Sequence, residues 1–316
     1  MTGPKQRIVF VTGKGGTGKS WLSVALAQEA ARRGVKTVRV QLSAPAEQSH
    51  RQPFGGAPRG AGGNEERNED RYHDQYDDLV IDEREALGEF LQALVPLGFL
   101  ARRLMDSRTF SAVAAATPGV RDLVALSRMA NLCRGRKPYN LVIVDAPASG
   151  HSVPLITSPA RVGDLVAVGP MAPLVRRLEK LVRDPEHFSI LVATTAEELA
   201  VVETIELVNE LATIGTPHAQ VVVNAVWPAH LDRAGAEWLR ETQGSRDALV
   251  HLRRRERQQE MIALLETNVG PTLSVAQDFG HTLGSGERGE RGERGERGEI
   301  AAIYDAVTST NARAAK

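Results

Sequence analysis

Cysteine is almost absent from this sequence, which contains Cys133 and no other among its 316 residues. A single cysteine excludes an intrachain disulfide, a two-cysteine metal clip and an iron–sulfur ligand pair built from this chain alone. Aromatic residues are also scarce, at 4%, whereas hydrophobic residues reach 42%. The core must therefore be mainly aliphatic, as in a parallel sheet that helices cover on both faces.

The sequence also lacks an excess of charge and any long apolar run. The 39 Lys and Arg balance the 39 Asp and Glu, and no basic stripe indicates nucleic acid as a main partner. No apolar run approaches the length of a transmembrane segment, and the first residues lack the apolar stretch of a signal peptide. We therefore expect a cytoplasmic protein with no nucleic-acid partner and no transmembrane segment.

The most specific pattern lies at residues 8–26, IVFVTGKGGTGKSWLSVAL. A β-branched strand over 8–12 leads into a glycine-rich loop, and a helix begins at Lys19 or Ser20. The loop matches G-x-x-x-x-G-K-[ST], in which backbone N–H groups and the helix N-terminus surround phosphate oxygens. Lys19 would reach the β- and γ-phosphates, and the Ser20 hydroxyl would hold Mg²⁺. The predicted nucleotide-binding residues of this loop are Gly13, Gly15, Gly16, Thr17, Gly18, Lys19 and Ser20.

Strand and helix patterns alternate along the rest of the chain, which favours an α/β fold with a doubly wound, mostly parallel sheet flanked by helices. We expect one domain over 1–280, with a flexible polar loop at 43–78 and a helical subregion at 83–133 inserted in it. The expected strands are 8–12, 36–42, 79–81, 139–144, 164–168, 189–194, 220–223 and 272–275. The expected helices are 20–33, 83–105, 119–133, 174–183, 196–212, 246–267 and 300–308.

The sequence GERGERGERGERG at 286–298 is a perfect triplet repeat. Four copies without proline cannot hold a collagen-like triple helix. We therefore expect a Gly-Glu-Arg linker over 281–299 and a short helix or tail over 300–316.

Polar residues that follow predicted strands are candidates for the same site, because parallel strands end at one edge of the sheet. Asp145 follows the strand 139–144 and could bind the Mg²⁺ shell through water, although an aspartate there could also cap a helix. Gly150 would let the backbone approach the γ-phosphate. Asn224 follows the strand 220–223, where its amide could read a base edge or simply belong to a turn.

Four segments together resemble the arsenical-pump and tail-anchored-protein-targeting ATPase family. They are K-G-G-x-G-K-[ST] from Lys14, D-x-x-x-[ST]-G-H from Asp145, AEELAVVET at 196–204 and V-N-x-V-x-P at 223–228. The resemblance implies a P-loop NTPase fold that binds ATP and Mg²⁺ and works as a homodimer, or as a heterodimer with a related ATPase. It implies that Lys14 reaches across the dimer to the partner's nucleotide, so that Lys14, Lys19 and Asp145 are the catalytic residues. It also implies that Asp145 is the metal-shell residue of switch II and that Asn224 contacts adenine.

The sequence departs from that family in three ways. Ala44 stands where the family's switch I aspartate orients the attacking water; Glu47 is a conjectural substitute, and hydrolysis could be slow, partner-dependent or absent. One cysteine supports neither a zinc-clipped dimer nor an arsenite site. The subregion 83–133 contains only Met105 and Met129, so its apolar residues form either a core or a groove for a hydrophobic protein client.

Two alternatives to an ATPase that handles a client therefore stay open. One is a catalytically weak nucleotide-binding scaffold, paired with a related ATPase. The other is a partition- or cell-division-type positioning ATPase, which is disfavoured because the tail shows neither an amphipathic membrane helix nor a basic surface.

Overall fold

The computed structural model of the chain describes a defined set of residues. These are 7–42, 76–81, 119–134, 137–147, 149–165, 171–216, 219–229, 233–242, 245–277 and 287–308. The predicted helix 83–105, the positions Ala44, Glu47 and Met105, and most of the predicted loop 43–78 lie outside these residues. Tyr76 to Asp78 are described, and Asp77 and Asp78 belong to a strand rather than to the loop.

The described residues form a seven-stranded sheet in the order β3-β2-β4-β1-β5-β6-β7, and every neighbouring pair in it is parallel. Its strands are β1 (Arg7–Gly13), β2 (Thr37–Leu42), β3 (Asp77–Ile81), β4 (Leu141–Asp145), β5 (Phe188–Thr195), β6 (Gln220–Val226) and β7 (Leu273–Ala276). Strand β1 lies in the middle, with β4 and β5 as its neighbours. The structure confirms the predicted α/β fold class.

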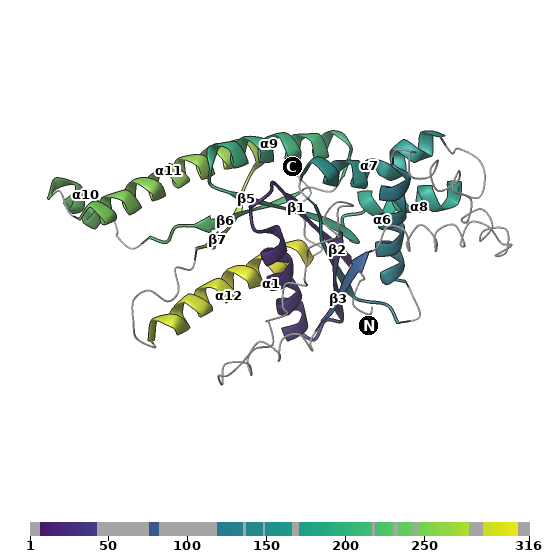
Figure 1. Cartoon of the computed structure of the whole chain (residues 1–316), viewed down its shortest axis with the longest axis horizontal. Coiled ribbons are helices and arrows are strands. Elements are labelled where there is room, and N and C mark those ends of the chain that lie inside the picture. Colours follow the sequence, from purple (N-terminus) through teal and green to yellow (C-terminus); the bar gives the residue numbers. More distant parts are fainter. Residues whose placement is uncertain are drawn as a thin grey trace, which may run out of the picture.

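Helices cover both faces of the sheet (Figure 1), as its strands require because they are apolar on both faces. The helices are α1 (Lys19–Arg32), α6 (Val120–Leu132), α7 (Ser149–Leu165), α8 (Ala172–Arg183), α9 (Glu198–Thr213), α10 (Arg233–Glu241), α11 (Arg246–Val269) and α12 (Glu287–Thr308). Successive residues of β1 point to opposite faces of the sheet and so belong to two different core clusters. Ile8 and Phe10 belong to the core shared with α6, α7, α8, α9 and α11, whereas Val9 and Val11 belong to the core shared with α1 and α12.

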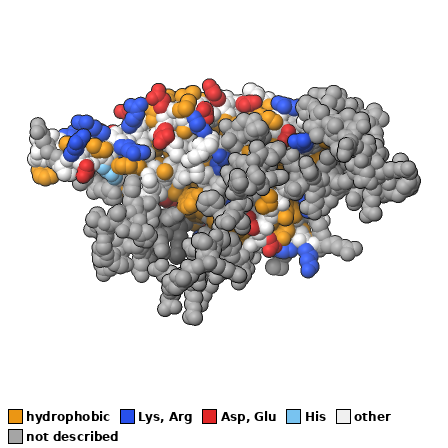
Figure 2. Space-filling model, viewed as in Figure 1, with side chains coloured by type: hydrophobic (Ala, Val, Ile, Leu, Met, Phe, Trp, Pro, Cys, Tyr) orange, Lys and Arg blue, Asp and Glu red, His pale blue; other side chains and the backbone are white. Residues whose placement is uncertain are grey.

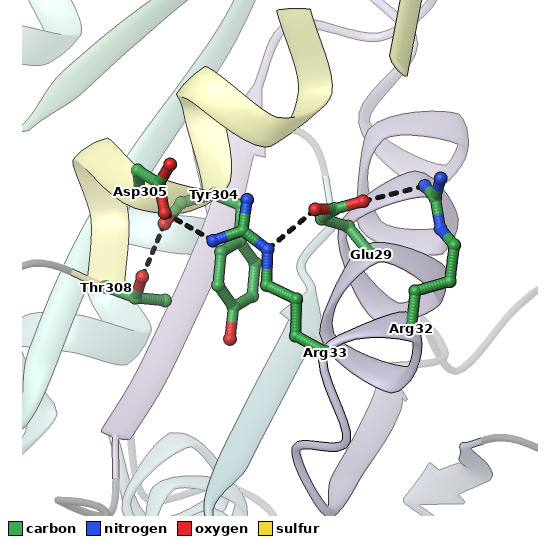
Figure 3. A network of polar contacts seen from close by, with 6 residues as sticks. All are labelled: Glu29, Arg32, Arg33, Tyr304, Asp305 and Thr308. Atoms are coloured by element: carbon green, nitrogen blue, oxygen red, sulfur yellow. Dashed lines mark hydrogen bonds and ion pairs between the residues drawn. The ribbon is translucent and has the colours of Figure 1, made fainter. Parts of the chain in front are cut away.

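A polar network joins the carboxyl end of α1 to α12 (Figure 3). Glu29 pairs with both Arg32 and Arg33, and the Arg33 guanidinium lies 4.4 Å from the centre of the Tyr304 ring. Arg33 also pairs with Asp305. These contacts hold α12 against the helix that begins at the glycine-rich loop.

The repeat region is the largest difference from the sequence-based expectation. The predicted linker over 281–299 is helical from Glu287 onward, and α12 continues without a break to Thr308. Glu and Arg are favourable helix residues, and the second half of α12 is anchored by the buried residues Ile300, Ile303 and Val307. Once that half is fixed, each further helical residue adds a hydrogen bond without a new nucleation cost.

Two further expectations are wrong. The predicted strand over 164–168 is not formed at its start, because Asp164 and Leu165 end α7, and 166–168 lie outside the described residues. Periodicity alone cannot distinguish the end of a helix from the start of a buried strand. The strand predicted for 220–223 continues to Val226, so Asn224 lies within β6.

The described part of the subregion 83–133 belongs to the core. In α6, Leu123, Leu126 and Met129 are fully buried, so this helix does not offer them to a client. The groove hypothesis therefore concerns residues outside the described part of the chain.

Helix α10 and the first half of α11 extend away from the sheet (Figure 1). Figure 2 shows Lys and Arg side chains over this end of the molecule. Within the described residues, no helix combines the length and apolarity needed to cross a membrane.

Candidate nucleotide-binding site

The predicted site residues gather at the carboxyl edge of the sheet. The glycine-rich loop follows β1, Asp145 ends β4 and Asn224 lies near the end of β6. Strand β4 is the direct neighbour of β1, and β6 is separated from it by β5 alone. The order of the strands therefore brings three segments that are far apart in the sequence to one crevice.

Two glycines of the loop are required by close contacts. Gly13 has φ 138°, and a Cβ placed on it would lie 2.1 Å from the carbonyl oxygen of Ala193 in β5. Gly18 has φ 87°, and a Cβ there would lie 2.1 Å from the Asn224 amide nitrogen. A side chain at Gly13 would have to displace the backbone of β5, whereas one at Gly18 would displace the Asn224 side chain; the positive φ adds strain at both positions.

The middle of the loop faces open space. A Cβ built at Gly15 or Gly16 would meet no atom within 4 Å, so a ligand can approach the backbone there. Helix α1 begins at Lys19, which directs its N-terminal N–H groups and partial positive charge towards this space. The loop thus has the shape and polarity of a phosphate cradle.

Lys19 supplies a partly buried ammonium to the loop. Its Nζ donates to the carbonyl oxygen of Lys14 at 2.8 Å, and Thr17 Oγ1 donates to the same oxygen at 2.9 Å. Burial lowers the pKa of the Lys19 ammonium, and the nearby Asp145 carboxylate opposes that shift. A phosphate oxygen would suit this cation, because a charged acceptor binds an ammonium more strongly than a neutral carbonyl does.

Lys14 reaches a residue of its own chain. Its Nζ lies 2.8 Å from Glu203 Oε1 on α9, and the two side chains are 30% and 36% exposed. Glu203 lies within the AEELAVVET segment, but sequence reasoning assigned it no role. The ion pair keeps the Lys14 ammonium near the surface beside the loop.

Asn224 contacts the loop rather than open space. Its Nδ2 donates to the Thr17 carbonyl oxygen at 3.1 Å, and its Oδ1 accepts from the backbone N–H of Ala225 at 2.9 Å. Ala225 is left-handed, with φ 57°, which lets the strand turn at this contact. The Nδ2 group therefore holds the glycine-rich loop, and the contact with Ala225 fixes the orientation of the Asn224 side chain.

Gln258 of α11 stabilises the chain that follows Asn224. It accepts from the Trp227 N–H at 2.8 Å and donates to the Ala225 carbonyl at 3.2 Å. The side chain is 8% exposed. The only sequence signal for this role is a glutamine within a helix otherwise rich in Arg and Glu.

Asp145 lies on the sheet face that α1 covers and is 11% exposed. Its Oδ2 is 3.6 Å from Arg39 Nη1, a neighbour that sequence reasoning missed. An arginine between the valines of β2 is nevertheless a detectable signal, because a buried cation requires a carboxylate partner. Asp145 and Ser20 could hold a metal ion together with phosphate oxygens and water.

The segment after Asp145 enters α7 at Ser149, so Gly150 lies in the first turn of a helix. Ser152 joins this turn to the loop strand: Thr12 Oγ1 donates to Ser152 Oγ at 2.6 Å, and Ser152 donates to the Pro147 carbonyl at 3.0 Å. A displacement of β1 would therefore also displace the segment that follows Asp145.

The described residues contain no group of three or more His, Cys, Asp or Glu able to hold a metal ion. The Asp145 carboxylate and the Ser20 hydroxyl instead suit Mg²⁺, which proteins commonly bind through one or two carboxylates together with substrate phosphates. The open glycine loop and the Lys19 ammonium likewise fit a nucleoside triphosphate.

Comparisons with known proteins match the part of the chain that contains the glycine loop and Asp145. A family model described as an anion-transporting ATPase matches residues 6–172, a stretch that includes the loop and Asp145 and ends at the first residue of α8. The ATPase BagA of Mycobacterium tuberculosis is 32% identical over 244 residues, which are 72% of this chain and 67% of that protein. Mb3704 of Mycobacterium bovis is similar to the same extent.

Proposed function

Because this chain belongs to the anion-transporting ATPase family, we propose that it binds Mg-ATP at residues 13–20 and couples ATP hydrolysis to the handling of a protein client. The observation that carries the proposal is the open glycine loop with the Lys19 ammonium at its base. An open backbone cradle, a helix N-terminus and a partly buried ammonium together favour a polyphosphate.

Each residue of the site has a proposed role. The loop N–H groups and Lys19 bind the phosphates, and Asn224 holds the loop on the side where the base would lie. Ser20 and Asp145 would hold Mg²⁺, which neutralises charge that develops on the phosphates during transfer. Gly150 would let the first turn of α7 approach the γ-phosphate.

Calorimetry of ATP binding tests the site. Lys19→Ala should abolish binding, whereas Lys180→Ala, which changes an exposed lysine of α8, should leave the affinity unchanged. Equal affinities of the Lys19→Ala variant and the wild type would overturn the assignment.

We propose further that ATP draws two subunits together, with Lys14 of each reaching the phosphates of the other. The partly exposed Lys14–Glu203 pair supports this role, because its weak ion pair can be exchanged at little cost. Lys14→Ala should retain ATP binding while it lowers ATP-dependent association in analytical ultracentrifugation. Wild-type association of that variant would contradict the role of Lys14.

A second candidate function follows from Ala44. Alanine can neither orient nor deprotonate a water molecule, so the chain could instead be a nucleotide-binding scaffold that pairs with a related, catalytically competent ATPase. Phosphate release at saturating Mg-ATP separates the two functions. Turnover by the wild type favours the ATPase, whereas turnover by the Ala44→Asp variant alone favours the scaffold.

A further inference from the structure

A buried polar cluster beside the glycine loop surrounds Arg39 in β2. Its side chain is 4% exposed and lies between two carboxylates, Asp78 of β3 and Asp145 of β4. Strand β2 lies between these two strands in the sheet. A buried guanidinium loses its hydration, and close carboxylates compensate for that loss.

The two carboxylates contact Arg39 in different ways. Asp78 forms a two-pronged pair, with Nε to Oδ1 at 2.9 Å and Nη2 to Oδ2 at 3.0 Å. Asp145 Oδ2 lies 3.6 Å from Nη1, which is too long for a direct hydrogen bond but close enough for strong charge attraction. Arg39 thus attracts the Asp145 carboxylate without donating a hydrogen bond to it.

The same guanidinium nitrogen also reaches α1. Nη1 donates to Ser23 Oγ at 3.3 Å, and the Ser23 hydroxyl donates to the Ser20 carbonyl oxygen at 2.8 Å. Ser23 is fully buried, so this path is shielded from water. Arg39 therefore contacts, directly or through one hydroxyl, both residues that would hold Mg²⁺.

We propose that Arg39 is a positioning residue for the magnesium shell. Its Nη1 group holds the Asp145 carboxylate and, through Ser23, the first turn of α1. Asp78 sets how closely Arg39 approaches Asp145 by engaging the other edge of the guanidinium. The inference rests on the proposed function, in which Ser20 and Asp145 hold Mg²⁺, and assigns Arg39 no contact with the phosphates.

Calorimetry of ATP binding with Mg²⁺ and with EDTA in its place tests the inference. The measured quantity is the Mg²⁺-dependent gain in ATP affinity. Arg39→Met should reduce this gain about tenfold or more, the cost typical of residues that orient metal ligands, while the affinity in EDTA stays near that of the wild type. Arg39→Lys, which keeps the charge but cannot contact both carboxylates at once, should restore part of the gain.

Arg7→Met is the matched control, because Arg7 is also a buried strand arginine on the face that α1 and α12 cover, but it lies at the amino end of β1, away from the glycine loop. It should lower the melting temperature and leave the Mg²⁺-dependent gain unchanged. A purely structural role of Arg39 would give the same pattern, with a lower melting temperature and an unchanged gain, and would overturn the inference.

Two further outcomes decide the remaining cases. If Arg39→Met does not fold, Arg39→Lys and the near-isosteric Asp78→Asn carry the test, since Asp78→Asn should let Arg39 close on Asp145 and compete with the metal shell. An unchanged gain in both would overturn the inference. If the wild type binds no ATP under either condition, the proposed function fails, and this inference fails with it.

Discussion

Buried basic residues lie both at the amino edge of the sheet and near the glycine loop, but their partners differ. At the amino edge, Arg7 donates, within the described residues, only to neutral acceptors, the carbonyls of Pro185, Glu186 and Val307 and the Ser189 hydroxyl. Burial lowers the pKa of Arg7, and the nearby Glu186 and Asp184 carboxylates partly offset that shift. Beside the glycine loop, Lys19 donates to one loop carbonyl. Arg39, in the middle of β2, contacts the carboxylates of Asp78 and Asp145. The first arrangement fastens three segments of the fold together.

Under the proposed function, a ligand would replace or extend the partners at the carboxyl edge. A phosphate oxygen is a stronger acceptor for Lys19 than the Lys14 carbonyl is, and a metal shell can share the Asp145 carboxylate. We infer that a cation whose acceptors all belong to the packed fold stabilises the fold, whereas a cation whose acceptor a ligand would replace or share serves a site. Substitutions at matched positions of the two edges can test this distinction.

The largest effect is expected for Gly13→Ala, compared with Gly34→Ala after α1. Both glycines have positive φ, but only the Gly13 Cβ would meet backbone, at 2.1 Å from the Ala193 oxygen. We expect Gly13→Ala to cost about 3 kcal/mol or more and to abolish ATP binding, from strain and overpacking together. Gly34→Ala should cost about 1–2 kcal/mol, from the left-handed conformation alone, and retain binding. Denaturant unfolding and calorimetry measure both, and equal costs would contradict the role of the close contact.

The next effect concerns the amino edge. Arg7→Met should lower the free energy of unfolding by about 2–4 kcal/mol, because several buried acceptors lose their donor. ATP affinity should not change. Arg183→Met, at a 51% exposed side chain, is the control and should cost less than about 0.5 kcal/mol. Weakened ATP binding by the Arg7→Met variant would contradict the claim that Arg7 stabilises the fold alone.

A smaller effect is expected from pH. Burial lowers the pKa of Lys19, and phosphates bind its charged form. ATP affinity should therefore fall as pH rises through that lowered pKa, by at most about tenfold per pH unit. The Lys19→Arg variant stays charged throughout this range, so any affinity that it retains should not show the alkaline decline. Identical pH profiles of the two proteins would exclude Lys19 as the titrating group.

The smallest effect on stability is expected at the Lys14–Glu203 pair. Glu203→Gln should change the free energy of unfolding by less than about 0.5 kcal/mol, because both side chains are partly exposed. It should nevertheless raise ATP-dependent association, since Lys14 loses its partner within the chain. Glu206→Gln, at an exposed position of the same helix, should have no effect on sedimentation. Equal association of the wild type and both variants would show that Glu203 has no influence on dimer formation.

Local patterns predicted β1, the glycine loop and α1 closely, because a strand, a turn requirement and a helix start coincide there within a few residues. They also placed Asp145 at the correct edge of the sheet. The contacts of Arg39 and Asn224 could not be predicted, because each depends on which strands become neighbours. The identity of a residue shows that it needs a partner, but only the strand order shows which one it finds.

The errors at the ends of α7 and α12 have a different origin. The sequence over 164–168 fits either a helix end or a buried strand, and the structure shows that Asp164 and Leu165 end α7. In the repeat, the glycines indicate a linker whereas Glu and Arg favour a helix. The buried half of α12 settles that competition in favour of the helix.

Helix α1 joins the loop to the Arg33 network over 14 residues, a length of about 21 Å. A helix is stiff along its axis, so an axial displacement of Lys19 must either carry Arg33 with it or break the contacts of Arg33 with Tyr304 and Asp305 (Figure 3). An axial displacement of the glycine loop would therefore be transmitted along α1 to the contacts that Arg33 makes with α12. Under the proposed function, nucleotide binding at the loop would change the position of α12 through these contacts.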